Sequence, residues 1–440
     1  MKSVTDHRLS KLINAMLTRP SAIRSMMKLA DERNIRKMGL DPKDVISFGG
    51  GWVGHHAPDR LREIYAEICL DREKFHCASG YPPIPGIPEC RRALAHMDEF
   101  LFGVKASEAN IHVGASSTEL TYDLLRILAD PHDNILLLDP TYVNYHGQLV
   151  LALTNWTENQ SCNNDEFHVP DARIIHLRVF DPVSWEYLPD VDYAIAELER
   201  IFKIHKPKVL MLASPDNPTG QIIPHKFMKA ALEICENNGS YLVIDYAYKW
   251  QYFVETLPEY FSWSPEEYEN LVLIYSASKW SRALGRRLGW ICAPRKIVEA
   301  METMLAYSIL CGDHFHQLAM AIYLEESIAD RSLKAYVDMW NEKYKNAAKV
   351  TVETIDEYCG CRRLVPQGAL YTVMDLGNTA EPLVHEILKN TGVLFIPGIG
   401  FGKSLINGVR VSYGPLVEKP EKIKEGLRRT GEYLSSRKKK

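Results

Sequence analysis

The chain has 440 residues, of which 46% are hydrophobic and 25% are charged, and its formal net charge is −4. This composition is typical of a globular protein with a real core, and the slightly acidic balance argues against a protein built to bind nucleic acid. The nine cysteines are scattered without a C-x-x-C pair, so neither a zinc site nor a disulfide framework is indicated.

The N-terminal segment shows neither a targeting signal nor a membrane span. "MKSVTDHRLSKL" lacks the apolar stretch of a secretory signal, and no window of the chain approaches the roughly 18 apolar residues that cross a membrane. The sequence therefore predicts a cytoplasmic protein with reduced thiols and no membrane partner. Residues 1–50 are interpreted as an N-terminal arm and helix that join a small domain.

From about residue 110 to 295, short apolar runs alternate with helical patterns, which predicts an α/β fold with a mostly parallel sheet covered by helices. We expect a large domain over residues 51–300 with a sheet of the seven-stranded type, interrupted by a long polar surface loop at 154–171. The strand candidates are apolar almost throughout, which suits strands buried on both faces; they are "NILLLDP", "ARIIHLRV", "PKVLMLAS", "SYLVIDYAY", "LVLIYSAS" and "RLGWICAP".

A second, smaller α+β domain is predicted over residues 301–440. Helical periodicity dominates from about 295 to 358, and a helix is expected near 380–390 and another from about 418. Between them lie the apolar segments "GALYTVMDL", "GVLFIPG" and "GVRVSYG".

Polar residues follow the predicted strands at the points where each strand ends. Because ligands of parallel α/β sheets collect at the carboxyl ends of the strands, we expect these side chains to converge on one mouth. The residues are Ser116, Ser117, Thr118, Tyr142, Asn217, Asp245, Tyr248, Ser276, Ser278 and Lys279.

These residue types suit a phosphate and a protonated heteroaromatic ring that is joined to a lysine. Hydroxyls and backbone N–H groups at the helix start around Ser117 and Thr118 can cradle a phosphate. Further phosphate contacts can come from Ser276, Ser278 and the forked guanidinium of Arg287. The other members offer a ring face, a carboxylate for a ring nitrogen and donors for a phenolate-type oxygen, and they are Tyr142, Asp245, Asn217 and Tyr248.

The stretch "SASKWSRALGRRLG" fits the pattern S-x-S-K-x-x-x-x-x-G-x-R-x-G at every fixed position. On this string, and from "SAIRSMMKLA" to "GVRVSYG", the chain resembles the class I/II aminotransferase group of fold type I pyridoxal-phosphate enzymes. The resemblance implies pyridoxal 5'-phosphate as cofactor and a Schiff base at Lys279, with Asp245 and Tyr248 as its catalytic companions. It further implies phosphate contacts from Ser276 and Arg287, a pyridinium partner in Asp245, ring stacking by Tyr142, an oxygen contact from Asn217 and a substrate α-carboxylate clamp in Arg410.

The same resemblance implies a homodimer and a substrate class. Tyr81 of "YPPIPG" matches a tyrosine that reaches the phosphate of the neighbouring subunit. The N-terminal "RPSAIRSMMKLA" followed by "VISFGGG" is similar to the 2-aminoadipate and aromatic aminotransferase branch, in which this helix lies over the active site. Arg24 is then either the partner of a distal carboxylate or a plain helix-surface arginine, while Gly51 and Trp52 are expected to line the pocket. An acidic or aromatic L-amino acid and a 2-oxo acid are the implied substrates.

Other functions on this scaffold stay possible, while two further motifs in the sequence lack what their usual functions require. A pyridoxal-phosphate lyase, a cyclase or a carbon-carbon bond-forming enzyme on the same scaffold stays open. "GGGWVG" matches a dinucleotide-binding loop without the βαβ unit that must follow it. His55 and His56, like His314 and His316, have no carboxylate or cysteine set at metal-ligand spacing, so no metal site is expected.

Overall fold

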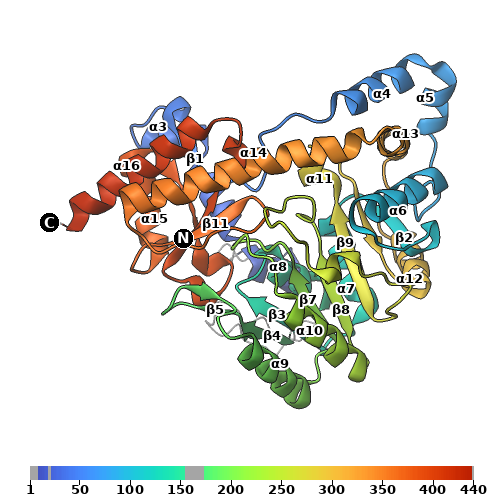
Figure 1. Ribbon diagram of the computed structural model, residues 1–440, viewed down its shortest axis with the longest axis horizontal. Helices are drawn as coiled ribbons and strands as arrows, with labels where there is room; N and C mark the ends of the chain where they lie inside the picture. The colour runs from blue at the N-terminus through green and yellow to red at the C-terminus, as the bar shows by residue number, and fades with distance from the viewer. Residues whose placement is uncertain (1–7, 18–20, 154–172, 439–440) are drawn as a thin grey trace.

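The computed structural model describes residues 8–17, 21–153 and 173–438 (Figure 1). The long loop predicted at 154–171 lies outside the described residues. It therefore stays a prediction.

A seven-stranded sheet forms the centre of the larger part, in the order β2-β10-β9-β8-β7-β3-β4. Neighbours from β9 to β4 are parallel, whereas β10 runs antiparallel to both β9 and β2. The mostly parallel sheet is thereby confirmed. The strands are β2 (Ile111–Gly114), β3 (Asn134–Asp139), β4 (Arg173–Arg178), β7 (Val209–Ala213), β8 (Tyr241–Asp245), β9 (Leu271–Ser276) and β10 (Gly289–Cys292).

Helices cover both faces of this sheet because its central strands are apolar on both sides. In β7, Leu210 and Leu212 belong to one hydrophobic cluster, while Val209 and Met211 belong to the cluster on the opposite face. Each such buried side chain contributes about 1.5–3 kcal/mol of transfer free energy. The first face carries α4 (Asp59–Leu70), α6 (Pro88–Phe102), α9 (Val191–His205), α10 (His225–Asn237) and α13 (His314–Ala329), and the second carries α7 (Ser117–Leu128), α8 (Asn144–Leu153) and α12 (Arg295–Leu305).

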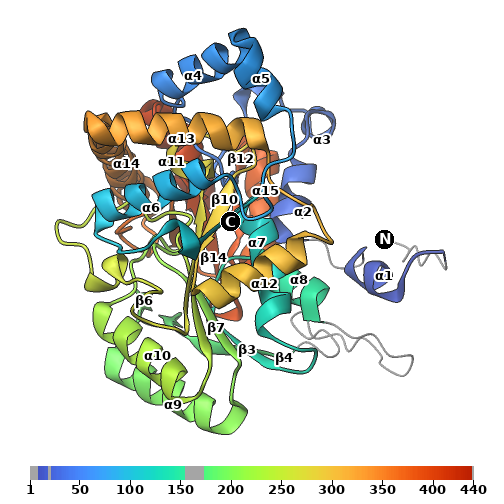
Figure 2. The same cartoon turned by 90° about the vertical axis from the view of Figure 1, so that its right-hand side faces the viewer.

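Figure 2 shows α9 and α10 side by side at one end of the molecule and α13 and α14 near the other end. Helix α5 (Arg72–Ala78) continues α4 and packs with it against α13. A short hairpin of β5 (Phe180–Asp181) and β6 (Glu186–Tyr187) follows β4. Helix α1 (Lys11–Leu17) has no buried residue.

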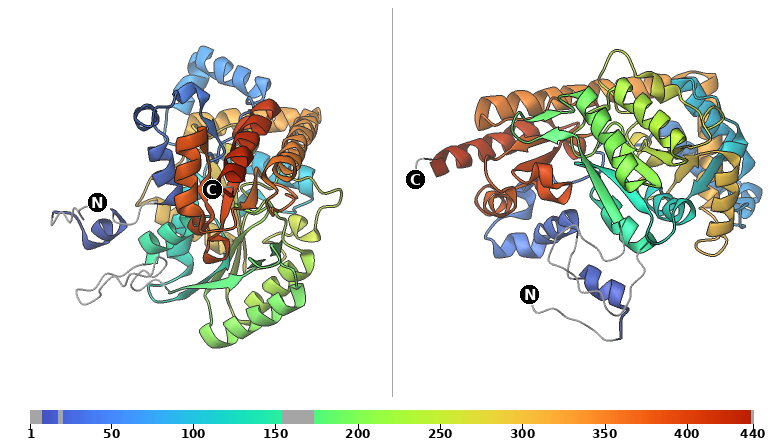
Figure 3. Two further views of the ribbon diagram at one scale, coloured as in Figure 1. Left: turned by 90° about the vertical axis from the view of Figure 1, so that its left-hand side faces the viewer. Right: turned by 90° about the horizontal axis from the view of Figure 1, so that it is seen from below.

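The smaller part is built on a three-stranded antiparallel sheet in the order β11-β14-β13, which confirms the predicted α+β pattern. Its helices α14 and α16 pack along each other, as Figure 3 shows. N-terminal residues join this part, because β1 pairs with β12 and Met26, Ile35 and Phe48 lie in its core. The bounds are α2 (Ala22–Leu29), α3 (Glu32–Lys37), β1 (Ile46–Ser47), α14 (Ser332–Thr354), β11 (Tyr371–Asp375), α15 (Ala380–Thr391), β12 (Val393–Leu394), β13 (Ile396–Pro397), β14 (Gly408–Ser412) and α16 (Pro420–Lys438).

The packing of α13 bears on where the large domain ends. The sequence placed the division at residue 300, yet α13 packs against α4 and α6 and contributes Ala319, Met320 and Leu324 to the core of the larger part. Helix α14 then runs from there to the smaller part, and its Trp340 and Tyr344 lie in the other core. The division of the chain at residues 50 and 300 stays a prediction, and this packing argues for a later second boundary.

None of the helices in the described ranges combines the length and the apolar character that a membrane span requires.

Candidate active site

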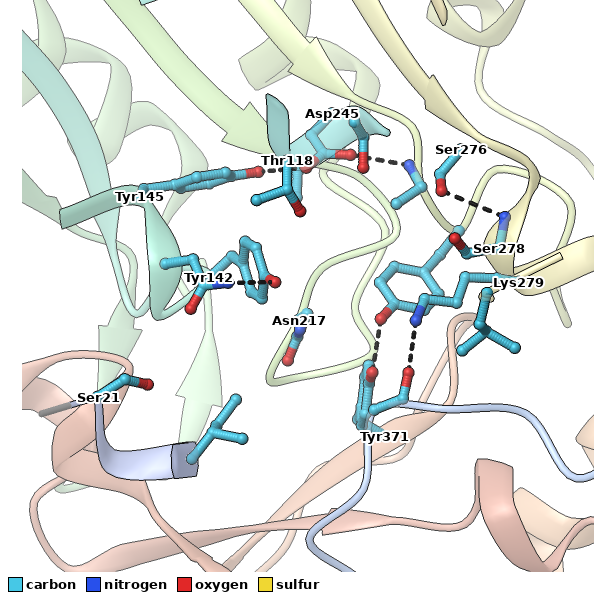
Figure 4. Close-up of a pocket in the computed structure, with 18 of the residues that line it drawn as sticks. Ser21, Thr118, Tyr142, Tyr145, Asn217, Asp245, Ser276, Ser278, Lys279 and Tyr371 are labelled. Atoms are coloured by element: carbon cyan, nitrogen blue, oxygen red, sulfur yellow. Dashed lines mark hydrogen bonds between the residues drawn. The ribbon is translucent and has the colours of Figure 1, made fainter. Parts of the chain in front are cut away.

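A cavity of about 380 Å³ opens at the carboxyl ends of the parallel strands, between the two parts of the molecule and α2 (Figure 4). Its walls come from segments that are far apart in the sequence. The residues that line it are Ser21, Ile23, Arg24, Gly51, Ser117, Thr118, Tyr142, Asn144, Tyr145, Ala213, Asn217, Asp245, Ala247, Tyr248, Ser276, Ser278, Lys279, Leu284, Arg287, Tyr371 and Arg410.

Lys279 enters the cavity from α11 (Ala277–Trp280), a single helical turn that directly follows β9. Its Nζ donates a hydrogen bond to the carbonyl oxygen of Gly51 at 2.5 Å. Burial and, after it, the charges of Arg410 and Arg287 lower the pKa of this amine to about 8, against the opposing effect of the Asp245 carboxylate. Roughly one tenth of the amine is therefore neutral and nucleophilic at pH 7.

Asp245 is the last residue of β8, and its side chain is buried beside the cavity. One carboxylate oxygen accepts a hydrogen bond from the Tyr145 hydroxyl at 2.7 Å, and the other accepts from the Ala247 amide at 2.9 Å. Burial raises the pKa of Asp245, while these two hydrogen bonds and the charge of Lys279 favour the ionised form. The carboxylate is thus held in a fixed orientation next to the cavity.

Arg410 is a buried cation on β14, only 1% exposed. It donates to Asn217 Oδ1 at 2.9 Å and to the Gly49 carbonyl at 2.8 Å, while its Nε has no partner among the described residues. The guanidinium lies 4.4 Å from the centre of the Tyr371 ring. Within the described part of the chain no carboxylate pairs with it, and a buried charge without a counterion is costly. The site is therefore suited to bind a carboxylate.

Two helix starts face the same cavity and suit an anion with several oxygens. Helix α7 begins at Ser117, so the first-turn amides of Ser117 and Thr118 have no helical acceptor of their own. In α11 the Ser276 hydroxyl accepts from the Ser278 amide at 3.2 Å. Arg287 also lines the cavity, with Nη1 donating to the Leu284 carbonyl at 2.8 Å.

Three consecutive glycine carbonyls of one segment accept hydrogen bonds from side chains around the cavity. Gly49 accepts from Arg410, Gly50 accepts from the Ser412 hydroxyl at 2.5 Å, and Gly51 accepts from Lys279. A glycine run permits this because no side chain stands between the backbone and the cavity; a Cβ at Gly51 would lie 3.1 Å from the Tyr371 hydroxyl. The "GGGWVG" stretch thus holds the site from one side.

The donor set fits pyridoxal phosphate. It offers helix-start amides and hydroxyls for a phosphate, a buried carboxylate for a ring nitrogen, an amine of lowered pKa for an aldehyde, and a buried arginine without a described carboxylate partner. Among the described residues no group of three or more His, Cys, Asp or Glu side chains is placed to hold a metal ion.

The family model described as aminotransferase class I and II matches residues 53–429. The chain belongs to this family. The aminotransferase is 26% identical over 397 residues to the aspartate aminotransferase of Pyrococcus horikoshii, a match that covers 90% of this chain and 92% of the relative. It is 25% identical over 419 residues to aromatic-amino-acid aminotransferase 2 of Thermococcus litoralis, with 93% and 95% covered.

A solved structure supports the fold of the aminotransferase. The aspartate aminotransferase from Thermus thermophilus with maleate superposes with a TM-score of 0.79 at 23% identity, over 96% of this chain and 99% of that chain. Both show the same α/β arrangement, which agrees with the predicted fold type I.

Three residues that the sequence assigned to the site of the aminotransferase do not line the cavity. Ser116 instead caps α7, because its hydroxyl accepts from the Glu119 amide at 3.1 Å. Trp52 follows the glycine run but is 37% exposed, outside the cavity lining. Tyr81 is 86% exposed, so its predicted role depends on a second subunit.

The structure also adds residues that sequence reasoning missed. Tyr145 orients Asp245, and Tyr371 lies with its hydroxyl 2.5 Å from that of Tyr248 (Figure 4). Asn144 donates to the Tyr142 hydroxyl at 2.8 Å. A signal for Tyr145 existed in "PTYVNY", because the string that gave Tyr142 also places a second tyrosine at the start of α8. Tyr371 carried no comparable signal.

Proposed function

We propose that this aminotransferase uses pyridoxal 5'-phosphate to move the amino group of an acidic or aromatic L-amino acid to a 2-oxo acid. The observation that carries the proposal is the Lys279 amine with a pKa of about 8 in a cavity that also contains the Asp245 carboxylate and the Arg410 guanidinium. An amine, an acid for a ring nitrogen and a carboxylate clamp are the three groups that this chemistry needs.

When bound, pyridoxal phosphate supplies an aldehyde that condenses with amines and a ring that withdraws electrons from the Cα of an amino acid. Lys279 supplies the amine for attachment. With a substrate bound, the free Nζ would be the base that takes the proton from Cα and the acid that gives it back. Such a positioned proton transfer contributes about 10²–10⁴-fold to the rate.

The other residues hold the reacting atoms in place. Asp245 keeps a ring nitrogen protonated, and Tyr145 keeps that carboxylate in orientation. Arg410 binds the α-carboxylate together with Asn217, to which it is already hydrogen-bonded. The start of α7 with Ser276, Ser278 and Arg287 binds the phosphate. Tyr142 would offer its ring face to the cofactor ring, and the Tyr248 hydroxyl would be a donor to the ring oxygen.

The substrate class is proposed from the edge of the cavity. Arg24 on α2 lines it, and its side chain is exposed to solvent, so it can meet a distal carboxylate without a buried partner. The relatives named above are aspartate and aromatic-amino-acid aminotransferases, which supports acidic and aromatic donors. A cytoplasmic homodimer, with the exposed Tyr81 ring reaching the phosphate of the partner subunit, completes the proposal.

Lys279→Ala tests the central role. We expect this variant to lose turnover by at least about 10²–10⁴-fold and to retain cofactor by non-covalent contacts alone. Borohydride reduction followed by peptide mass spectrometry should mark residue 279 in the wild-type protein and leave the variant unmarked. Lys296→Ala, which changes an exposed lysine on α12, is the matched control and should behave as wild type. Turnover of Lys279→Ala at the wild-type rate contradicts the proposal.

A half-reaction separates transfer from the lyase or cyclase alternative. With an amino acid and no 2-oxo acid, the wild-type enzyme should release one oxo acid per site and then stop, while its absorbance changes to that of the amine form of the cofactor. Many turnovers without an acceptor would instead establish elimination or ring formation. A panel of acidic, aromatic and aliphatic donors in the same assay identifies the donor class.

A further inference from the structure

His55 is a buried histidine that the proposed reaction does not use, and it contacts the backbone of the residue that follows Lys279. It is only 1% exposed. Its Nδ1 lies 2.6 Å from the Tyr344 hydroxyl of α14, and its Nε2 lies 3.2 Å from the carbonyl oxygen of Trp280. The ring also packs on Trp340 with the ring centres 4.4 Å apart. Both ring nitrogens therefore have a hydrogen-bond partner, and the partner of Nε2 belongs to α11.

The two partners determine which nitrogen carries the proton. A carbonyl oxygen only accepts, so Nε2 must be the protonated nitrogen that donates to Trp280. Nδ1 then accepts from the Tyr344 hydroxyl. Burial, with smaller contributions from the charges of Arg282 and Lys343, lowers the pKa of His55 to about 4, although the hydrogen bond to Trp280 acts in the opposite direction. The ring is thus neutral across the physiological range, with a fixed tautomer.

Helix α11 depends on such contacts because it consists of four residues. A single turn is too short to be stable alone, and its last carbonyls have no partner in a following turn. The Ser276 hydroxyl accepts from the Ser278 amide at one end, and His55 donates to the Trp280 carbonyl at the other end. Tyr336 lies 3.1 Å from both the Trp280 and the His56 carbonyls, and its single hydroxyl proton can serve only one of them fully. His55 is the donor committed to Trp280.

We infer that His55 is a positioning residue, which fixes the backbone of α11 through the Trp280 carbonyl and so directs Lys279 Nζ into the cavity. The segment 51–55 contacts both the side chain and the backbone around Lys279. The Gly51 carbonyl accepts from Nζ, and His55 donates to the carbonyl of Trp280, the next residue. This inference rests on the proposed function, because only a lysine that attacks and transfers protons needs its direction fixed this closely.

Hydrogen exchange in the cofactor-free protein tests the contact independently of turnover. His55→Phe keeps a ring against Trp340 and removes both hydrogen bonds, while His55→Gln restores a donor near the position of Nε2. We expect the amides of residues 279–282 to exchange at least about tenfold faster in His55→Phe and near the wild-type rate in His55→Gln. His56→Gln, a change at the exposed neighbouring histidine, is the control and should leave exchange unchanged. Wild-type exchange in His55→Phe overturns the inference.

Kinetics test whether the contact serves the reaction. Misplacing a reacting group by about 1 Å costs on the order of 10²-fold, so kcat of His55→Phe should fall about 10- to 100-fold while KM for the donor changes less than about threefold. His55→Gln should recover most of this loss. Equal losses in both variants, or a change in KM alone, overturn the inference.

Two outcomes separate this inference from the proposed function. If His55→Phe fails to fold, the double variant His55→Phe with Tyr344→Phe, which leaves no unpaired hydroxyl, takes its place in both measurements. If no donor supports transfer by the wild-type enzyme while exchange responds as expected, the proposed function fails and the contact stands. Normal transfer by every His55 variant, with altered exchange, overturns the positioning role alone.

Discussion

The Lys279 amine lies near two arginines and one carboxylate, and these charges, together with burial, set its pKa. Burial disfavours the charged form, Arg410 and Arg287 repel it, and Asp245 stabilises it. A lysine in water holds its proton until about pH 10.5, the ordinary value. The same residue here is a nucleophile at neutral pH because burial and, after it, the charges of Arg410 and Arg287 lower its pKa to about 8.

The reactivity of Lys279 in the cofactor-free protein should therefore follow its lowered pKa. Only the neutral amine reacts, so labelling of Lys279 by trinitrobenzenesulfonate should rise about tenfold per pH unit and level off near pH 8, against an ordinary midpoint of 10.5. Arg410→Gln removes a repelling charge, raises the pKa and moves the plateau to higher pH. Peptide mass spectrometry reads residue 279, with the exposed Lys296 as internal reference. A plateau near pH 10.5 in the wild-type protein contradicts this account.

Sequence reasoning found the site residues that follow recognisable apolar runs. It missed the residues whose role depends on contacts with distant parts of the chain. Lys279, Asp245 and Arg410 follow apolar runs, so their placement at strand ends could be predicted, and the structure brings them together. Tyr371 and His55 act through residues more than 100 positions away in the chain. No local pattern encodes such partners, which is why the sequence assigned neither residue a role in the site.

At the scale of elements, the proposed phosphate site depends on how closely β10 approaches the start of α7. Gly289 pairs with Gly114 of β2 on one side and with Ser276 of β9 on the other. A Cβ at Gly289 would press directly on the Ser117 amide nitrogen and lie 2.6 Å from the Ser116 carbonyl carbon. The contact is with backbone, which cannot swing away as a flexible side chain can. Gly289 of β10 thus lies against the start of α7 and beside Ser276, which precedes α11.

Gly289→Ala should accordingly push α7 away from α11. Overpacking of this kind costs about 1–3 kcal/mol, and the displaced amides of Ser117 and Thr118 should weaken cofactor affinity about tenfold or more. Gly147→Ala is the control, because no described atom lies within 4 Å of that Cβ and a helical alanine should stabilise by about 0.5–1 kcal/mol. Thermal melting measures the change in stability, and cofactor titration measures the change in affinity. Unchanged affinity in a destabilised Gly289→Ala protein would show that the proposed phosphate site does not depend on this packing.

The six strand candidates were all confirmed, while β2 was not predicted. Strands such as β9, "LVLIYS", are uninterrupted apolar runs, and burial on both faces requires them to be so. Strand β2 is "IHVG", four residues long with a histidine and a terminal glycine, and it lies at the edge of the sheet. Such a strand exists because β10 pairs with it, which the local sequence does not reveal.

At the scale of the whole molecule, the cavity is assembled from three regions that meet only after folding. The larger part supplies Lys279 and Asp245, β14 of the smaller part supplies Arg410, and α2 with the preceding Ser21 brings Arg24 to the edge. Helix α2 packs on the smaller part through Met26. Under the proposed function, a substrate in this cavity lies between groups that different regions carry, and its distal end faces α2.

Arg24→Ala should consequently change selectivity more than overall catalysis. A charge-assisted hydrogen bond contributes about 1.5–3 kcal/mol, so kcat/KM for acidic donors should fall about 10- to 100-fold, while aromatic donors, which lack the distal carboxylate, change less than about threefold. Arg33→Ala on α3 removes an exposed arginine that does not line the cavity and serves as the control. The measurement is kcat/KM for one acidic and one aromatic donor in each variant. Equal losses for both donors would assign Arg24 to the helix surface and leave selectivity to the remaining walls of the cavity.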